Sequence, residues 1–489
     1  MKTIRLQNYK CFEDTGKIDL LPLNFLVGCN SGGKSTFLEF FPLFQQSMHI
    51  NRNGAFLWTG NNVDLNDFKT VVRDGQDKIS IEIEIEKIPL YSGSLGQRNL
   101  YLENVKLVFV ISEVAFGDAI TYFCLSFNEQ TIEVRLKEKV SDEIIINGEN
   151  MGNEDEPIVH SFTNSLLPKL LFGSALYELT SRKGNKELYS WARQNLKGDE
   201  GSMAGPMWFR LRYIVHKEEF EKRINRTKKE EAEIADLQHI YNLALLYNIN
   251  DIIDVVNYYM LEFADKTEFL QPLRATAERY YRNRNISVNN ISPSGDNIAM
   301  FLLRLQRDGL LEKFNKWLHQ NEMQFGVELN EEGGFLELRI VEEGKQGQNI
   351  VDVGFGYSQI LPILANIWKD LFYEDVLGNR VSYCPTSLVL IEQPELHLHP
   401  RFQRKFADLL TKCVKQLQKS GKDVRFVIET HSQDILNSIG RSIAYGEFDA
   451  KLVNIYLFNA QKENMDKYIE KASYSKEGFL ENWPVGFFD

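Results

Sequence analysis

Residues 28–36 read Gly28-Cys29-Asn30-Ser31-Gly32-Gly33-Lys34-Ser35-Thr36, which fits the pattern G-x-x-x-x-G-K-[ST] of a phosphate-binding loop. Its glycines let backbone N–H groups face the phosphates, Lys34 reaches the β/γ oxygens, and the Ser35 hydroxyl can hold Mg²⁺. The apolar residues 23–27 before the loop predict a buried strand, and the apolar residues 37–41 after it predict a helix. This order predicts a nucleoside triphosphate site. The residues predicted to bind the nucleotide are Gly28, Asn30, Ser31, Gly32, Gly33, Lys34, Ser35 and Thr36.

Composition limits the class of protein. The chain has 489 residues, which is too long for one compact core and predicts two or three lobes. Its formal charge of −12 argues against tight, sequence-independent coating of nucleic acid. The five cysteines are scattered without a C-x-x-C pair, which predicts reduced thiols rather than a zinc site or a disulfide framework. No apolar run approaches a membrane span and no signal-peptide pattern opens the chain, so we expect a cytoplasmic protein without a membrane partner.

The pattern changes twice along the chain. Alternating apolar residues over 78–146 predict antiparallel strands attached to the nucleotide lobe, and a Gly/Asn-rich, acidic loop near 147–156 marks a boundary. From about 160 to 265 the pattern is helical. Its charge run over 217–236 is either a solvated helix or a projecting helical hairpin that meets a partner. The predicted parts are 1–155 (first part of the nucleotide lobe with the sheet), 156–270 (helical insert) and 271–489 (second part of the lobe).

The second part of the chain carries the other elements of a nucleotide site. A phosphate loop needs a metal-binding carboxylate near a strand end, and the apolar strand 387–392 ends in Glu392. The next strand, 424–429, runs into His431, which lies where ligands bind in parallel sheets, although a lone histidine there is also consistent with a structural role. A glycine-serine turn over 352–359 opens an apolar helix whose first N–H groups either face an anion or are simply capped.

In this order the elements resemble the ABC-type ATPase heads of the SMC, RecF and OLD group, and within it the AAA15 or AAA21 branch with a DUF3696-like C-terminus. The matching residues are Arg5–Phe12, Gly28–Thr36, Gly354–Gln359, Ile391–Pro400, Glu429–Ser432 and Asn482–Asp489. In pattern the chain is similar to the ATPase subunits of the Septu and PARIS anti-phage systems. The resemblance implies an α/β, ABC-type P-loop ATPase head, formed by 1–155 and 271–489, with an attached antiparallel β-sheet and a helical insert.

The resemblance also implies ligands and roles. ATP and Mg²⁺ are the implied ligands, with Ser35 and Glu392 on the metal and Gln45 and Gln46 as further candidates for the metal-contacting glutamine. His431 resembles the switch histidine at the γ-phosphate. The residues that resemble the signature element, which in this class contacts ATP bound to a second protomer, are Gly354, Gly356, Ser358 and Gln359. An ATP sandwich of this kind implies a homo-oligomer, either a dimer or a larger assembly.

One departure from the family pattern concerns catalysis. Most ABC ATPases place Asp-Glu at this strand end, with the Glu acting on the attacking water, whereas this chain has Glu392-Gln393. Gln393 can position a water but cannot be its general base, so we expect slow hydrolysis or a long-lived ATP-bound state. Glu395 either supplies the missing carboxylate or is a surface residue of the turn. The catalytic candidates are therefore Gln393, Glu392, Glu395 and His431.

The expected function is that of a sensor or scaffold ATPase that controls a separate effector in bacterial anti-phage defence. OLD-type nucleases add a Toprim module, for which no room follows His431, so we expect any nuclease activity in another subunit. One alternative is an SMC- or RecF-like DNA-repair clamp, and another is a nucleotide-gated scaffold with negligible turnover. A basic cluster either contacts DNA or forms ion pairs with the acidic insert; its members are Arg274, Arg279, Arg282 and Arg284.

Overall fold

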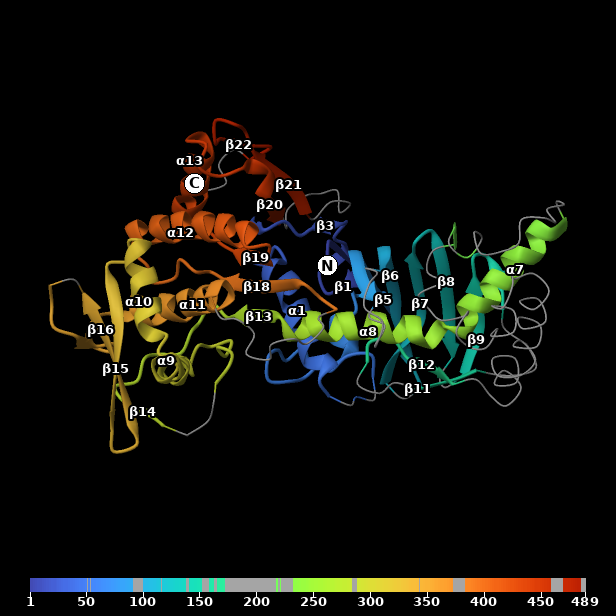
Figure 1. The fold of residues 1–489 in the computed structure, drawn as a ribbon, viewed down its shortest axis with the longest axis horizontal. Coiled ribbons are helices and arrows are strands. Elements are labelled where there is room, and N and C mark those ends of the chain that lie inside the picture. The colour runs from blue at the N-terminus through green and yellow to red at the C-terminus, as the bar shows by residue number, and fades with distance from the viewer. Residues whose placement is uncertain are drawn as a thin grey trace, which may run out of the picture. The chain divides into compact units, whose positions relative to one another are not determined.

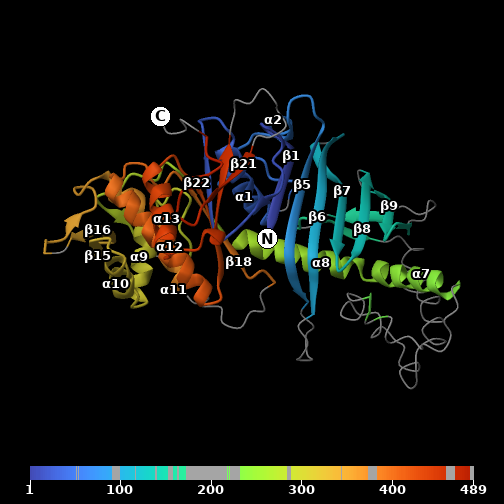
Figure 2. The same ribbon diagram turned by 90° about the horizontal axis from the view of Figure 1, so that it is seen from above.

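The computed structural model describes most of the chain as two compact units (Figures 1 and 2). Unit 1 comprises Met1–Asp19, Leu43–Asp265 and Val381–Cys384, and unit 2 comprises Leu20–Pro42, Lys266–Arg380 and Pro385–Asp489. The described residues are 1–50, 52, 54–90, 100–115, 117–137, 140–151, 158–161, 165–171, 217–218, 220, 232–283, 288–342, 344–372, 383–458 and 469–484. Much of the expected insert lies outside them, so the division at 155 and 270 stays a prediction.

Unit 1 contains an eleven-stranded antiparallel sheet with the order β12-β11-β9-β8-β7-β6-β5-β1-β2, in which β10 pairs with β9 and β3 with β1. The strands predicted from the alternation over 78–146 are present, which confirms the attached antiparallel sheet. The bounds are β1 (Thr3–Tyr9), β2 (Phe12–Asp14), β3 (Ile18–Asp19), β5 (Lys78–Leu90), β6 (Leu100–Val114), β7 (Gly117–Phe127), β8 (Gln130–Lys137), β9 (Val140–Ile146), β10 (Glu149–Asn150), β11 (Ile158–Ser161) and β12 (Lys169–Leu171).

The two faces of this sheet differ because side chains alternate along each strand. On β5 the isoleucines at 79, 81, 83 and 85 are buried. The helix α8 (Ile249–Asp265) packs against β5 and β12, and α7 (Ala232–Tyr247) packs against β9. Figures 1 and 2 show both helices running across the strands. The opposite face carries ion pairs such as Lys17 with Glu84 (2.6 Å) and Lys106 with Glu82 (3.1 Å). A short helix, α2 (Phe68–Val71), completes the described helices that lie wholly in this unit.

Unit 2 is built on a seven-stranded sheet with the order β13-β18-β19-β4-β20-β21-β22, in which the pairings from β13 to β20 are parallel. Its bounds are β13 (Thr267–Leu270), β18 (Thr386–Glu392), β19 (Asp423–Glu429), β4 (Leu23–Gly28), β20 (Val453–Phe458), β21 (Ile469–Tyr474) and β22 (Leu480–Glu481). The central strands read as nearly continuous apolar runs, as expected for parallel strands covered on both faces. This sheet confirms the predicted α/β class.

Helices and a smaller sheet complete unit 2. The helices are α9 (Ile298–Arg307), α10 (Leu311–Gln320), α11 (Phe355–Phe372), α12 (Pro400–Lys419), α13 (Gln433–Ala444) and the 3₁₀ helix η2 (Ala450–Leu452), while α1 (Lys34–Met48) begins in unit 2 and ends in unit 1. The small sheet has the order β14-β16-β15, with β17 paired to β16. Its strands are β14 (Tyr281–Arg282), β15 (Phe325–Glu332), β16 (Phe335–Glu342) and β17 (Gln348–Asn349). Across the described residues, no helix has the length and apolar character that a bilayer span requires.

Parallel pairing positions the functional residues. The strands β4, β18 and β19 end at Gly28, Glu392 and Glu429, and the carboxyl ends of parallel strands lie at the same edge of a sheet. The phosphate loop therefore begins at the edge where both carboxylates end their strands.

A close backbone approach between α13 and the turn before β22 gives a test of the fold. A Cβ atom on Gly478 would lie 1.9 Å from the carbonyl oxygen of Gly440, whereas a Cβ on Gly446 would meet nothing within 4 Å. Both glycines have a positive φ, of 77° and 71°. We expect Gly446→Ala to cost about 1 kcal/mol through its backbone conformation. Gly478→Ala should cost about 1–3 kcal/mol more, because the methyl group overpacks the contact.

Urea or thermal unfolding of the two variants measures this difference. Equal shifts for Gly478→Ala and Gly446→Ala would show that the contact with Gly440 does not constrain the fold.

Candidate nucleotide site

The phosphate loop is shaped by its neighbour β20. Gly28 is paired in register with Phe458, the last residue of β20. A Cβ on Gly28 would lie 2.1 Å from the carbonyl oxygen of Phe458, and a Cβ on Gly32 would lie 2.7 Å from the same oxygen. Only glycine fits this approach at both positions. After the loop, Phe37 donates its backbone N–H to the Gly33 carbonyl (2.9 Å) and α1 continues. The strand–loop–helix order predicted from the sequence is present.

Lys34 is turned into the loop. Its side chain is 3% exposed, and Nζ donates to the carbonyl oxygens of Gly28 (3.0 Å) and Cys29 (2.8 Å). Nζ also lies 4.0 Å from Oε1 of Glu429. Burial lowers the pKa of Lys34, and the negative charge of Glu429 opposes this shift. The ammonium group is therefore held between the loop carbonyls and one carboxylate.

That carboxylate, Glu429, was not among the residues predicted for the site. It is 2% exposed, and its Oε2 accepts a hydrogen bond from the Ser35 hydroxyl (2.9 Å). Its Oε1 accepts one from the Gln393 amide (3.4 Å). The signal in the sequence was a repeated ending, since β18 and β19 both end in Ile-Glu. Three predicted site residues, Lys34, Ser35 and Gln393, thus converge on a residue that the sequence analysis missed.

Glu392, the predicted metal ligand, ends the neighbouring strand. It is 6% exposed and is paired in register with Glu429. Burial raises the pKa of Glu392 to about 8, with further contributions from the negative charges of Glu429 and Glu39, and Arg274 partly offsets the shift. The Arg274 guanidinium donates to the backbone carbonyl of Glu392 (2.8 Å). The site therefore contains two adjacent buried carboxylates and a buried cation.

The four arginines of the basic cluster considered for DNA binding do not share one environment in the structure. Arg274 is 4% exposed and belongs to the nucleotide site, so it is not available to a DNA phosphate. Arg279 forms two hydrogen bonds with Asp352, of 3.0 and 2.6 Å. Arg282 is exposed on β14, and Arg284 lies outside the described residues. The described residues of this segment, 274–283, form an irregular stretch and the short strand β14 rather than a helix.

Glu395 connects the turn after β18 to the loop after β19. Its Oε1 accepts the backbone N–H of His431 (2.7 Å), and its Oε2 accepts the Thr430 hydroxyl (2.8 Å). Burial raises the pKa of Glu395, and these two bonds partly counter the rise. The His431 ring is disfavoured as a cation, because desolvation and the nearby Lys34 charge lower its pKa. Glu395 thus fixes the loop that carries His431 and is not an isolated surface residue of the turn.

The predicted signature residues lie at the start of α11. Gly354 has a φ of 108° just before the helix, and Gly356 lies against the His397 carbonyl oxygen, which would be 3.0 Å from a Cβ there. Ser358 is 7% exposed and donates to the carbonyl of Phe355 (2.7 Å), while Gln359 is 1% exposed. These side chains face inward, and their predicted contact with a second protomer stays a prediction.

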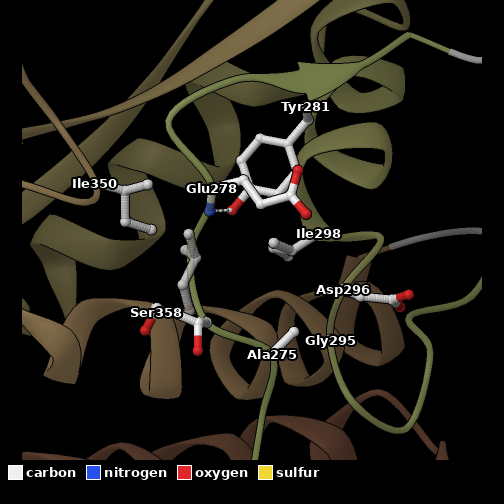
Figure 3. A pocket seen from close by; sticks show the side chains of 10 residues that line it. Ala275, Glu278, Tyr281, Gly295, Asp296, Ile298, Ile350 and Ser358 are labelled. Carbon is white, nitrogen blue, oxygen red and sulfur yellow. Dashed lines mark hydrogen bonds between the residues drawn. The ribbon is translucent and has the colours of Figure 1, made fainter.

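A small cavity lies beside this turn (Figure 3). It measures about 30 Å³, and one side of it is formed by Ser358 and Ala275. On its other side Tyr281 accepts a hydrogen bond from the backbone N–H of Glu278 (3.1 Å). Such a volume holds about one or two water molecules. The cavity is therefore too small for a nucleotide.

The two glutamines named as metal candidates are bonded within unit 1. The Gln46 amide donates to the carbonyls of Leu57 (2.7 Å) and Val63 (3.0 Å), and the Gln45 amide donates to the carbonyl of Ala264 (3.0 Å). The oxygen of Gln45 accepts from the Asn62 amide (3.0 Å). A metal role for Gln45 and Gln46 stays a prediction, and the loop residues with which they would act belong to unit 2.

The oxygen-bearing side chains near the phosphate loop are suitable ligands for a Mg²⁺ ion that binds together with a nucleotide. Within the described parts of the chain, no group of three or more His, Cys, Asp or Glu side chains is arranged to hold a metal ion alone. Mg²⁺ in nucleotide sites needs no such group, because phosphate oxygens and water supply most of its ligands and the protein adds one or two. A hydroxyl from Ser35 and buried carboxylates at the same sheet edge meet this requirement.

Comparison with known proteins identifies the family. Residues 1–436 match the family described as "AAA ATPase domain". The chain belongs to the AAA ATPase domain family. This match confirms the resemblance to ATPases that the phosphate loop and the later strands indicated.

Two curated relatives of this ATPase are similar over short stretches. The retron Ec83 probable ATPase of Escherichia coli is 29% identical over 103 residues, which cover 20% of this chain and 17% of that protein. The endonuclease GajA of Bacillus cereus (strain HuB5-5) is 32% identical over 90 residues, which cover 17% of this chain and 12% of that protein. The chain thus matches less than a fifth of the length of either relative.

Two solved structures of SMC heads also align. The Smc head bound to the C-winged helix domain of ScpA gives a TM-score of 0.38 at 10% identity and covers 97% of this chain and 98% of that one. The SMC head domain from Thermotoga maritima gives a TM-score of 0.32 at 10% identity and covers 96% and 97%.

The bonds of Glu395 predict a structural effect on mutation. In Glu395→Gln only one side-chain oxygen remains, so the His431 N–H or the Thr430 hydroxyl loses its acceptor. Loss of one hydrogen bond in this partly solvent-exposed network costs about 0.5–1.5 kcal/mol. We therefore expect a lower unfolding midpoint, measured by thermal or urea denaturation. The matched control is Glu447→Gln, at an exposed glutamate of the same unit, which should leave the midpoint unchanged.

The opposite pattern is equally measurable. If Glu395→Gln keeps the wild-type midpoint and abolishes ATP hydrolysis, Glu395 is the catalytic carboxylate and its bonds to the loop are secondary.

Proposed function

We propose that this chain is an ATP-dependent sensor or scaffold that hydrolyses ATP slowly, oligomerises through bound ATP and controls a separate effector, a nuclease, in bacterial anti-phage defence. The observation that carries the nucleotide part is the convergence of Lys34, Ser35 and Glu429 at the edge of the parallel sheet. Resemblance to Septu and PARIS ATPase subunits supports the defence role. Similarity to a retron ATPase and to an endonuclease agrees with it, over short stretches of both proteins.

The residues of the loop carry out binding. Lys34 exchanges the carbonyls of Gly28 and Cys29 for the β/γ-phosphate oxygens when ATP enters. The Ser35 hydroxyl and Glu392 are the predicted Mg²⁺ ligands, and the ion they would hold would supply positive charge to offset that of the phosphates. Gln393 orients the attacking water without accepting its proton. His431, which Glu395 fixes through its backbone, is the predicted γ-phosphate contact.

A second candidate function is a nucleotide-gated scaffold with negligible turnover. The glutamine at position 393 favours it, because this residue has no titratable acceptor where most ABC ATPases have a glutamate. The DNA-clamp alternative receives less support from the basic cluster, since Arg274 is buried and Arg279 is paired with Asp352. Single-turnover and steady-state ATP hydrolysis by the purified chain separate the slow ATPase from the scaffold.

The nucleotide assignment is tested at Lys34. In Lys34→Ala the charged contact to the β/γ-phosphates is lost. A charged hydrogen bond contributes about 1.5–3 kcal/mol, so we expect ATP affinity to fall by about tenfold or more. Isothermal titration calorimetry measures the change, and Lys451→Ala, at an exposed lysine of the same unit, is the matched control. Equal ATP affinity in Lys34→Ala and the wild type would reject the site.

The sandwich assembly is tested on the exposed part of the signature turn. Ser358 is buried, so its substitution would disturb the fold, whereas Phe355 is 43% exposed at the first position of α11. Phe372, at the other end of the same helix, is 42% exposed and serves as the matched control. We expect Phe355→Asp to bind ATP normally but to lose ATP-induced association, because a desolvated carboxylate disfavours a protein interface. Phe372→Asp should associate as the wild type does.

Light scattering with and without ATP gives the result. The model of an ATP sandwich through this turn is wrong if Phe355→Asp and Phe372→Asp associate to the same extent.

A further inference from the structure

The order of the strands places Glu429 nearer to the phosphate loop than Glu392. Strand β19 lies directly between β18 and β4, with Glu429 paired to Leu26 of β4 on one side and to Glu392 on the other. Adjacent strands are about 4.7–4.9 Å apart, so Glu429 is one strand from the loop-bearing strand and Glu392 is two. The carboxylate next to the loop is therefore the one on β19.

The contact with Ser35 identifies what Glu429 can bind. The hydroxyl at this position of the loop motif is the group that holds Mg²⁺. A hydroxyl has one donor and two acceptor lone pairs, so Ser35 can donate its proton to Glu429 at 2.9 Å while its oxygen still binds a cation. The carboxylate that accepts this hydrogen bond is therefore placed to contact a cation bound by Ser35.

The local charges favour a cation at this point. Glu392 and Glu429 are buried and adjacent, so ionising both carboxyl groups is costly unless a positive charge lies between or beside them. The Nζ atom of Lys34 is 4.0 Å from Oε1 of Glu429. When ATP is bound, this ammonium group contacts the phosphates and no longer offsets the charge of Glu429 alone. A divalent cation that arrives with ATP compensates both the carboxylates and the phosphates.

We infer that Glu429 is a ligand of the Mg²⁺ that accompanies ATP, together with Ser35. The inference rests on the proposed nucleotide binding and gives a role to a residue that the sequence motifs left without one. Gln393 is then a positioning residue for the metal site, because its amide holds the second oxygen of Glu429 at 3.4 Å. One or two carboxylates with phosphate oxygens and water satisfy Mg²⁺, so the site needs no all-protein metal cluster.

The test measures metal binding separately from hydrolysis. The full chain is mixed with Mn²⁺ and a non-hydrolysable ATP analogue, and electron paramagnetic resonance follows the loss of free Mn²⁺. We expect Glu429→Gln to weaken Mn²⁺ binding by at least about tenfold. Binding of the analogue in EDTA, measured by calorimetry, should not weaken, because the amide keeps the shape of the side chain and removes a negative charge. Glu447→Gln is the control for loss of one surface carboxylate.

Two results would overturn the inference. The first is wild-type Mn²⁺ binding by Glu429→Gln. The second is an equal gain in affinity for the analogue with and without metal, which would mean that Glu429 only competes for Ser35 and Lys34. Glu429→Asp keeps the charge and repeats the measurement if the glutamine variant fails to fold; it should bind Mn²⁺ more tightly than Glu429→Ala. Lys34→Ala separates failure of the metal inference from failure of the proposed nucleotide site. Wild-type analogue binding by Lys34→Ala would reject the nucleotide site itself.

Discussion

The pairing of β19 with β4 is the constraint on which the site depends. Asn24, buried in β4, donates to the carbonyls of Leu21 (2.6 Å) and Phe426 (2.9 Å) and so joins segments 402 residues apart. The parallel pairing of β19 with β4 keeps the same register to the carboxyl ends of both strands, and this register places Glu429 beside the phosphate loop. A shift of one residue in this register would turn Glu429 to the opposite face of the sheet and separate it from Ser35. The chemistry of the loop therefore depends on hydrogen bonds at the far end of its strand.

Buried charges at this edge of the sheet support the proposal that ATP binds as its Mg²⁺ complex. Glu392, Glu395 and Glu429 provide three carboxyl groups near the phosphate loop, and Lys34 and Arg274 provide two cations. Arg274 is already bonded to a backbone carbonyl, and Lys34 is bonded to two. A free triphosphate would add several negative charges beside these carboxyl groups in a poorly solvated place. Mg²⁺ removes that repulsion, so we expect the metal complex rather than free ATP to be the ligand.

Local sequence patterns predicted the helices and strands around the nucleotide site. The pairing order of strands that are distant in the sequence determines which side chains reach the phosphate loop. The loop, its strand and its helix follow from a contiguous motif, and the alternation of isoleucines over 79–85 shows on its own which face of β5 is buried. The sequence does not reveal that β19 lies between β18 and β4, so it favoured Glu392 and passed over Glu429. Arg274 lies in an irregular segment without periodicity, and for that reason its burial could not be predicted. The two bonds of Glu395 depend on the approach of the turn after β18 to the loop after β19.

The hydrogen bonds that the carboxylates at this edge of the sheet already accept affect the expected rate of ATP hydrolysis. Among the described residues, Glu395 holds the loop of His431 with both oxygens, and Glu429 receives the Ser35 hydroxyl and the Gln393 amide. Hydrogen bonds of this kind stabilise the charged form of a carboxylate, so those to Glu395 oppose the rise in its pKa that burial causes without cancelling it. Gln393 cannot accept the proton at all. The proposed slow turnover therefore rests on the glutamine at position 393, and it agrees with our proposal of an assembly that is controlled by ATP binding rather than by rapid hydrolysis.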